Sequence, residues 1–398
     1  MSKYVIVLGA SRYYAKAIEA VRIAGYRVIA VDRNPESPGF AYADESEVCD
    51  IIDFDGVERI AKKWNASAII PLNDYGVMTA AVVSEKLGLI GISPHAAELS
   101  TKKSMMRQAW SAAGVVCPLF EIVKKGSSLR DAIHRVGYPC ILKPAIGCGG
   151  ASRGVIVVRS EGEVNDAIAF TLGFYDDQTT LVEGFVESVS EHSAEVLIYG
   201  GEVHVITVAD KIKTPLPYRV DKDVLYPTSI EPSLLEKVNT DIAKAVKALN
   251  VNVGAAHIEF AIDASGEVVF FEMGARCGGG GTSAPIVPYV TGVDLCVELV
   301  RILSGDTPVN LAPLYNKGCC YHFITPKPGV ITSLEGEEAM RSSNEVLDAA
   351  FFYEAGDMIL SVTVGSERSG FIIAGGESRQ LAYDNACKAE GYLTIEIQ

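Results

Sequence analysis

A glycine-rich loop that directly follows a short apolar strand restricts most strongly how this chain can fold. Residues 138–144 read Tyr-Pro-Cys-Ile-Leu-Lys-Pro, and half of the residues from 147 to 154 are glycine. A buried strand would deliver Lys143 to the base of this loop, where backbone N–H groups could surround an anion. An ordinary hairpin turn needs only about one or two glycines. The pattern therefore predicts a phosphate-binding flap with contacts from Gly147, Gly149, Gly150 and Ser152.

This loop differs from a Walker A motif. Its lysine comes before the glycines, no Gly-Lys-Ser or Gly-Lys-Thr ending follows, and residues 155–158 have the apolar character of a strand rather than of a helix. We therefore expect a flap between two strands that covers the triphosphate of a nucleotide.

Residues 3–92 alternate between apolar strands and helical segments, which is the rhythm of a doubly wound parallel sheet. We expect its strands at 4–8, 27–32, 48–52 and 67–72. A dinucleotide-binding fold is the alternative, because a strand leads into Gly9 and Asp32 ends the second strand. However, residues 12–14 are Arg-Tyr-Tyr, which places bulky side chains where the backbone must approach a pyrophosphate.

The rest of the chain predicts mixed α+β structure. The hydroxyl caps Ser93-Pro94 and Ser100-Thr101 predict two successive helices, the second ending at Ala113. The expected domains are an N-terminal α/β domain at 1–95, a central domain at 96–313 with a small lid at about 128–206, and a small C-terminal α+β domain at 314–398.

Two later strands, expected at 255–262 and 268–273, each carry a glutamate. Strand alternation places His257 and Glu259 on one face and Ile258 and Phe260 on the other, and Glu272 ends the next strand. Carboxylates on paired buried strands repel each other unless a cation lies between them. Oxygen ligands together with nucleotide phosphates suit Mg²⁺. Glu259 and Glu272 are therefore candidate metal ligands; the alternative is that each forms an ion pair with a lysine or arginine.

A third signal is weaker. Residues 181–187 read as an apolar strand that ends in open backbone, which could hydrogen-bond the edge of an adenine. A following carboxylate could hold ribose hydroxyls. Taken alone, the acids at 187, 191 and 195 are equally typical of a solvated acidic face.

Composition excludes several classes of function. The chain has 35 basic and 50 acidic residues, a net charge of -15, and no basic block that could neutralise a run of phosphates, so we expect no nucleic-acid partner. No apolar stretch approaches the roughly 20 residues of a membrane helix. The first residues read as a strand without a signal cleavage pattern, and the nine cysteines are scattered, so we expect a cytoplasmic protein with reduced thiols.

Taken together, these segments resemble the ATP-grasp superfamily over nearly the whole chain, in type and in order. The resemblance implies that Lys103 and Lys143 contact the nucleotide. It also implies that the adenine hinge is formed by Glu183, Gly184, Phe185 and Val186. It further implies that Glu191 holds the ribose, that Glu259 and Glu272 bind the metal, and that Arg276 faces an acyl phosphate or a substrate carboxylate. Lys143 and Arg276 are the candidate catalytic residues.

The same resemblance implies a function. ATP and Mg²⁺, or alternatively Mn²⁺, would activate a substrate carboxylate as an acyl phosphate, which an amine would then attack. The length suits an amino-acid or dipeptide ligase, working as a homodimer on small molecules. The alternatives are a biotin-carboxylase-like or purine-pathway carboxylase-like enzyme that uses bicarbonate, and an ATP-binding regulatory protein without catalysis. Substrate contacts are expected from residues 211–222 and 277–283.

The chain departs from the ATP-grasp pattern at two positions. Gly274 stands where many members have an asparagine ligand, and Lys102 stands where an acid is customary. The first departure implies that one metal ligand is missing or is replaced by water.

Overall fold

The computed structural model describes residues 3–145, 152–174 and 179–398. The first element is a four-stranded parallel sheet with the order β3-β2-β1-β4. Its strands are β1 (Tyr4–Leu8), β2 (Arg27–Asp32), β3 (Glu45–Val48) and β4 (Ala68–Pro71). Helix α1 (Ala15–Ile23) connects β1 to β2, α2 (Phe54–Trp64) connects β3 to β4, and α3 (Asp74–Leu87) follows β4. The expected doubly wound parallel sheet is confirmed. The strand expected at 48–52 was wrong, because the chain pairs with β2 three residues earlier and then turns into α2.

Two helices lead from this sheet to the rest of the chain. Helix α4 (Pro94–Thr101) begins as predicted, since the Ser93 hydroxyl accepts a hydrogen bond from the Ala96 N–H at 3.1 Å. The predicted hydroxyl cap of the second helix was wrong. Ser100 and Thr101 are the last residues of α4 and donate to the Ala97 carbonyl, while α5 (Lys103–Ala112) starts after Lys102 without a side-chain cap.

An antiparallel sheet of eight strands forms the middle of the molecule, in the order β13-β12-β9-β10-β11-β14-β18-β16. The strands are β9 (Ser188–Tyr199), β10 (Glu202–Lys213), β11 (Asp221–Tyr226), β12 (Gly254–Asp263), β13 (Val268–Gly274), β14 (Gly318–Ile324), β16 (Val346–Phe351) and β18 (Gly370–Gly376). Because β11 pairs with β14, strands from the last third of the chain continue the sheet that carries Glu259 and Glu272.

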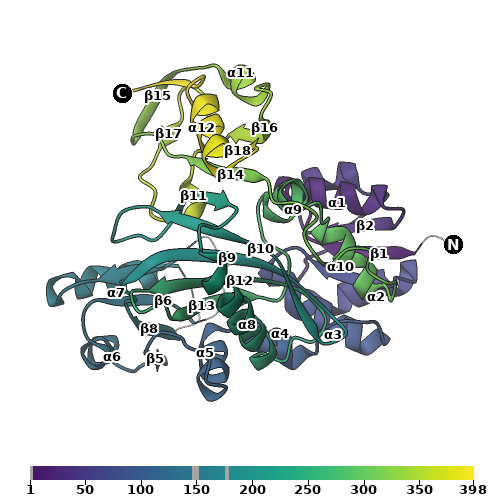
Figure 1. The fold of residues 1–398 in the computed structure, drawn as a ribbon, viewed down its shortest axis with the longest axis horizontal. Helices are drawn as coiled ribbons and strands as arrows, with labels where there is room; N and C mark the ends of the chain where they lie inside the picture. Colours follow the sequence, from purple (N-terminus) through teal and green to yellow (C-terminus); the bar gives the residue numbers. More distant parts are fainter. Residues whose placement is uncertain (1–2, 146–151, 175–178) are drawn as a thin grey trace.

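Helices cover this sheet at different ends. Helix α8 (Pro232–Ala248) packs with α4 and α5 on the β9, β12 and β13 end, where Trp110 and Phe260 are buried in one core. Helix α10 (Leu295–Leu303), which follows the short α9 (Val287–Thr291), shares a second core with the first sheet. Helix α12 (Arg379–Glu390) packs behind β14 and β18. Figure 1 shows the first sheet and the C-terminal elements on different sides of the central strands.

A small lid holds the lysine strand. Its sheet has the order β5-β8-β6-β7, with β5 (Phe120–Val123), β6 (Cys140–Pro144), β7 (Ile156–Val158) and β8 (Thr180–Gly184), together with helices α6 (Leu129–Val136) and α7 (Val164–Leu172). Strands β6 and β7 are antiparallel neighbours, as expected for strands on either side of a flap. Gly147, Gly149 and Gly150 lie outside the described residues.

A three-stranded sheet completes the fold, with the order β17-β15-β19. Its strands are β15 (Gly329–Glu335), β17 (Met358–Ile359) and β19 (Thr394–Ile397), and the short helix α11 (Glu337–Arg341) lies beside them. Across the described part of the chain, no helix combines the length and apolarity that crossing a membrane requires.

Candidate active site

A cleft of about 660 Å³ opens between the first sheet, the lid and the central sheet. Every predicted site residue that the structure describes lines it: Lys103, Lys143, Ser152, Glu183, Gly184, Phe185, Val186, Glu191, Glu259, Glu272 and Arg276. The carboxyl ends of β1 and β4 contribute one wall, which is where ligands bind in open parallel sheets.

Lys143 lines the cleft and forms an ion pair with the buried Glu183. Its Nζ is 2.6 Å from the Glu183 carboxylate, and the Arg107 Nε donates to the same carboxylate at 2.6 Å. Burial lowers the pKa of Lys143 to about 8, with Arg107 contributing, although Glu183 opposes the shift. Burial would raise the pKa of Glu183, but the two cations hold it below its usual range. The carboxylate of Glu183 therefore positions Lys143, and the residue itself lies between β5 and β6 in the sheet of the lid.

In the predicted adenine hinge after β8, two backbone N–H groups already form hydrogen bonds with other parts of the backbone. The Gly184 N–H donates to the Leu119 carbonyl at 2.8 Å, and the Phe185 N–H donates to the Pro139 carbonyl at 3.0 Å. The Val186 N–H has no hydrogen-bond partner within the described ranges. It is therefore the hinge donor that remains for a ligand.

The edge of the flap and the predicted ribose acid both contact the segment before β11. The Ser152 hydroxyl donates to the Arg219 carbonyl at 2.8 Å, and the Arg219 side chain pairs with Glu191. Lys213 lies 3.8 Å from the same glutamate. Glu191 thus faces the cleft with two cations beside it.

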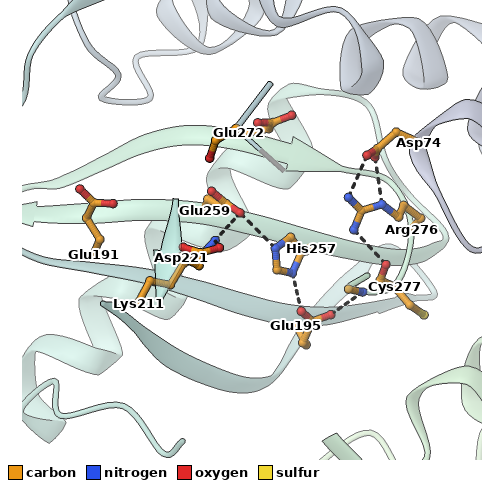
Figure 2. A network of polar contacts seen from close by, with 12 residues as sticks. Asp74, Glu191, Glu195, Lys211, Asp221, His257, Glu259, Glu272, Arg276 and Cys277 are labelled. Atoms are coloured by element: carbon orange, nitrogen blue, oxygen red, sulfur yellow. Dashed lines mark hydrogen bonds and ion pairs between the residues drawn. The ribbon is translucent and has the colours of Figure 1, made fainter. Parts of the chain in front are cut away.

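Glu259 and Glu272 lie directly opposite each other on the paired strands β12 and β13. Each has a lysine partner. The Lys211 Nζ is 2.5 Å from Glu259 (Figure 2), and the Lys103 Nζ is 2.5 Å from Glu272. Burial would raise the pKa of Glu259, but Lys211 and His257 hold it well below its usual range. The side chain of Glu272 is 37% exposed.

These carboxylates suit a hard cation. Glu259 is held ionised, Glu272 is open to the cleft, and both offer oxygen atoms. Residues 3–145, 152–174 and 179–398 contain no group of three or more His, Cys, Asp or Glu side chains arranged for a metal. One or two carboxylates with nucleotide phosphates and water are what Mg²⁺ typically takes. The structure also realises the alternative in which each glutamate pairs with a lysine, so the metal assignment remains a prediction.

His257 connects the glutamates of the central sheet. Its Nδ1 hydrogen-bonds the Glu195 carboxylate, which also accepts from the Gly278 N–H at 2.9 Å, and its Nε2 is 3.5 Å from Glu259. Burial would lower the pKa of His257, but the two glutamates raise it to about 9. At neutral pH the ring is therefore a cation between two carboxylates.

Arg276 forms an ion pair with Asp74, the first residue of α3. Its Nε and Nη2 donate to the Asp74 carboxylate at 2.9 and 3.0 Å, and its Nη1 donates to the Cys277 carbonyl at 3.0 Å (Figure 2). A Cβ atom at Gly274 would lie 2.8 Å from the Asp74 carboxylate and 3.3 Å from the guanidinium. The Asp74–Arg276 ion pair therefore leaves no room for a side chain at position 274. The contact of Arg276 with an acyl phosphate remains a prediction.

The sequence reasoning missed Asp74 and Arg368, which line the cleft, and Arg107, which pairs with Glu183. Asp221 also lines the cleft and lies in the segment 211–222 that was expected to contact the substrate. Asp74 had a usable signal, because Asn73-Asp74 directly follows β4 at the carboxyl edge of a parallel sheet. Arg107 lies one helical turn from Lys103 on α5, which also could have been read. Arg368 had no local signal.

Comparisons with known proteins agree with this arrangement. The family model of the carbamoyl-phosphate synthase L chain, ATP binding domain, matches residues 102–310, which is more than half of the chain. The L-amino acid ligase C-terminal domain 2 matches residues 322–398. The carbamoyl phosphate synthase large chain of Micrococcus luteus is 26% identical over 365 residues, which cover 83% of this chain and 32% of that protein. The chain thus spans about a third of that relative.

Two solved structures share the fold. The L-amino acid ligase of Bacillus licheniformis matches with a TM-score of 0.84 and 22% identity, covering 100% of this chain and 99% of that one. The biotin carboxylase domain of the 2-oxoglutarate carboxylase of Hydrogenobacter thermophilus, solved as a dimer with MgADP and bicarbonate, matches with a TM-score of 0.76 and 21% identity, covering 100% and 91%.

The lid, the central sheet and the cleft with its lysines and paired glutamates define an ATP-grasp ligase, a class of enzyme that uses ATP with Mg²⁺ and releases ADP. More particularly, the chain belongs to the family of the carbamoyl-phosphate synthase L chain ATP-binding domain.

Proposed function

We propose that this protein joins a substrate carboxylate to an amine, as an amino-acid or dipeptide ligase does, and releases ADP and phosphate. The observation that carries the proposal is the convergence of Lys103, Lys143, Glu259 and Glu272 on one cleft. The match of residues 322–398 to an L-amino acid ligase domain supports the choice of substrates.

The chemistry has two steps. A carboxylate oxygen attacks the γ-phosphorus of ATP, the bond to the β-phosphate oxygen breaks, and ADP leaves with that electron pair. The amine then attacks the acyl carbon, and phosphate departs with the oxygen that links it to that carbon; the proton of the amine ends on phosphate.

The residues of the cleft serve these steps by position and charge. Lys143 and Lys103 would place positive charge beside the phosphates. The Val186 N–H, which has no partner within the described ranges, would donate a hydrogen bond to the adenine. When bound by Glu259 and Glu272, Mg²⁺ would neutralise charge on the transferred phosphoryl group. The flap that includes Gly147, Gly149 and Gly150 would keep water from the acyl phosphate.

An ADP-release screen tests this function. Purified protein is given Mg-ATP with amino acids singly and in pairs, with bicarbonate as a control. We expect release of ADP and phosphate only with an amino acid or a similar carboxylate. AMP with pyrophosphate as products would contradict the acyl-phosphate route, and turnover with bicarbonate alone would indicate a carboxylase. Nucleotide binding without turnover on any carboxylate would indicate a regulatory protein.

We further propose that the protein is a cytoplasmic homodimer with the domain limits 1–95, 96–313 and 314–398. Support for the dimer comes from the dimeric biotin carboxylase domain among its structural neighbours. Light scattering of the purified protein tests the dimer, and limited proteolysis followed by mass spectrometry tests the domain limits.

A further inference from the structure

The C-terminal side of the cleft carries a group of aromatic rings that the nucleotide reaction does not require. We call Tyr13, Tyr321, Phe323, Phe352 and Phe371 the aromatic wall; all five line the cleft. Tyr13 comes from the turn after β1, and the others come from β14, β18 and the end of β16. Ring centroids lie 6.0 Å apart for Tyr13 and Phe371 and 5.6 Å apart for Tyr321 and Phe371. Tyr13 and Phe352 are the exposed members of the wall, and the Arg12 guanidinium lies beside it, 5.1 Å from the Phe352 centroid. The wall therefore offers a ligand an apolar surface formed mainly by these two rings.

Arg368 lies against this wall with incomplete hydrogen bonding. Its guanidinium carbon is 3.6 Å from the centroid of the Phe323 ring, and 14% of its side chain is exposed. Its Nε is shielded from solvent and has no hydrogen-bond partner among the residues the structure describes. When a guanidinium stacks on an aromatic ring, its N–H donors point outward, parallel to the plane of the ring. In this orientation they can bind a carboxylate in bidentate fashion.

The charges around Arg368 leave a place for an anion. Its nearest carboxylate is Asp221, with Nη2 to Oδ2 at 3.9 Å, beyond hydrogen-bonding distance. Asp221 is itself engaged by Lys211 at 3.2 Å and Lys213 at 2.6 Å. Among the described residues, the connected group of ion pairs contains five cations, Lys211, Lys213, Arg219, His257 and Arg368, and four carboxylates, Glu191, Glu195, Asp221 and Glu259. Burial also lowers the pKa of Arg368.

We propose that Arg368 and the aromatic wall form the subsite for an amino-acid substrate with a large apolar or aromatic side chain, whose carboxylate pairs with Arg368. This inference rests on the proposed ligase function and names the substrate class. A carboxylate would pair with the part of the Arg368 side chain that lines the cleft, and the rings of Tyr13 and Phe352, 37% and 38% exposed, would pack on the substrate side chain. Through Asp221 and Lys211 the subsite adjoins Glu259, where the phosphoryl group is expected.

Binding of labelled L-phenylalanine, measured by equilibrium dialysis, tests the arginine. The full chain is used with Mg²⁺ and a non-hydrolysable ATP analogue. We expect Arg368→Gln to weaken binding about tenfold or more, Arg368→Lys to weaken it less, and the surface control Arg341→Gln to leave it unchanged. Wild type should bind L-phenylalaninamide about tenfold more weakly than L-phenylalanine, and Arg368→Gln should abolish that difference. If Arg368→Gln does not fold, the comparison with the amide in wild type decides.

The aromatic wall is tested separately with Phe352→Ala. We expect this variant to weaken binding of L-phenylalanine severalfold and that of L-alanine little, because only the larger side chain reaches the rings. Wild type that prefers L-alanine, or binds no L-phenylalanine, would overturn the proposal. So would an Arg368→Gln variant that binds L-phenylalanine as wild type does, or that loses affinity for the ATP analogue instead.

The carboxylate could belong to the acyl donor or to the amine acceptor, and hydroxylamine distinguishes them. If Arg368 binds the donor, Arg368→Gln raises the KM for L-phenylalanine in hydroxamate formation. If it binds the acceptor, hydroxamate formation from the donor is unchanged and only dipeptide formation suffers. The two proposals are tested independently, because equilibrium dialysis measures binding and needs no turnover. Absence of ADP release with every amino acid would contradict the ligase function, whereas the dialysis results alone decide whether Arg368 binds the amino acid.

Discussion

Glu272 is the residue at which the structural and the metal-binding roles can be separated. Its lysine partner Lys103 is almost buried, with 9% of its side chain exposed, whereas Glu272 is 37% exposed. We expect Glu272→Gln to lower the free energy of unfolding by only about 1 kcal/mol without ligand, since the pair is partly solvated and the amide oxygen still accepts a hydrogen bond. The variant should show a much smaller thermal shift with Mg-ATP than wild type and turnover near background.

Thermal unfolding with and without Mg-ATP measures this, with the surface variant Glu267→Gln as the control. A Glu272→Gln variant that retains full Mg-dependent turnover, or that unfolds far earlier than wild type without ligand, would show that Glu272 is only a structural partner.

Gly274 allows a second prediction at this scale. Its missing side chain leaves room for the Asp74 carboxylate, and that carboxylate holds two of the guanidinium nitrogens of Arg276. In Gly274→Ala the new methyl group must push Asp74 away, so we expect turnover to fall at least tenfold and the free energy of unfolding to fall by roughly 1 to 3 kcal/mol. Gly162→Ala, whose new Cβ meets nothing closer than 3.9 Å, is the control. Equal turnover in both variants would remove the Asp74–Arg276 pair from the mechanism.

Strands in which apolar residues alternate strongly could be predicted from the sequence. The residues that form ion pairs with their side chains could not. Strands expected at 255–262 and 268–273 are β12 and β13 to within a residue, because apolar alternation sets both strand limits and the face of Glu259. The lysines that neutralise Glu259 and Glu272 lie 48 and 169 residues away in the chain. No local pattern specifies such pairings. For the same reason the continuation of β11 into β14, which brings Arg368 to the cleft, was not foreseen.

The flap gives a prediction for one element. Strands β6 and β7 are paired and packed in the lid core, so the loop between them is not needed to hold the lid together. We expect deletion of Gly149 and Gly150 to leave thermal unfolding unchanged and to lower turnover, because a shortened loop cannot close over the phosphates. Turnover and unfolding are measured on the same preparation. A folded deletion variant with unchanged turnover would exclude the flap from the reaction.

At the scale of the whole molecule, the cleft depends on every part of the chain. Asp74 comes from the start of α3, Lys143 from the lid, Glu259 from the central strands and Arg368 from the C-terminal part. Ion pairs such as Asp74–Arg276 cross between these parts and fix their relative positions. The site is therefore sensitive to how the C-terminal elements attach to the central sheet, and this attachment includes a buried histidine.

His322 on β14 makes that attachment dependent on pH. Its Nδ1 hydrogen-bonds Asp223 on β11 at 2.5 Å, and its Nε2 is 3.1 Å from Glu390 on α12. Burial would lower its pKa, but the two carboxylates raise it to about 9, above the roughly 6.5 of an unfolded chain. A raised pKa in the folded state means that the stabilisation is complete below about pH 6.5 and is lost as the pH rises through 9.

We therefore expect His322→Gln to be less stable than wild type by on the order of 2 to 3 kcal/mol at about pH 6, and by much less at about pH 10. Urea unfolding at the two pH values measures the difference, and the exposed His95→Gln serves as the control. Because neutral glutamine cannot replace the charge that both Asp223 and Glu390 receive, the loss at low pH should include weaker docking of α12 on β14. A destabilisation of equal size at both pH values would mean that His322 contributes by packing, and that its proton does not hold the C-terminal elements on the central sheet.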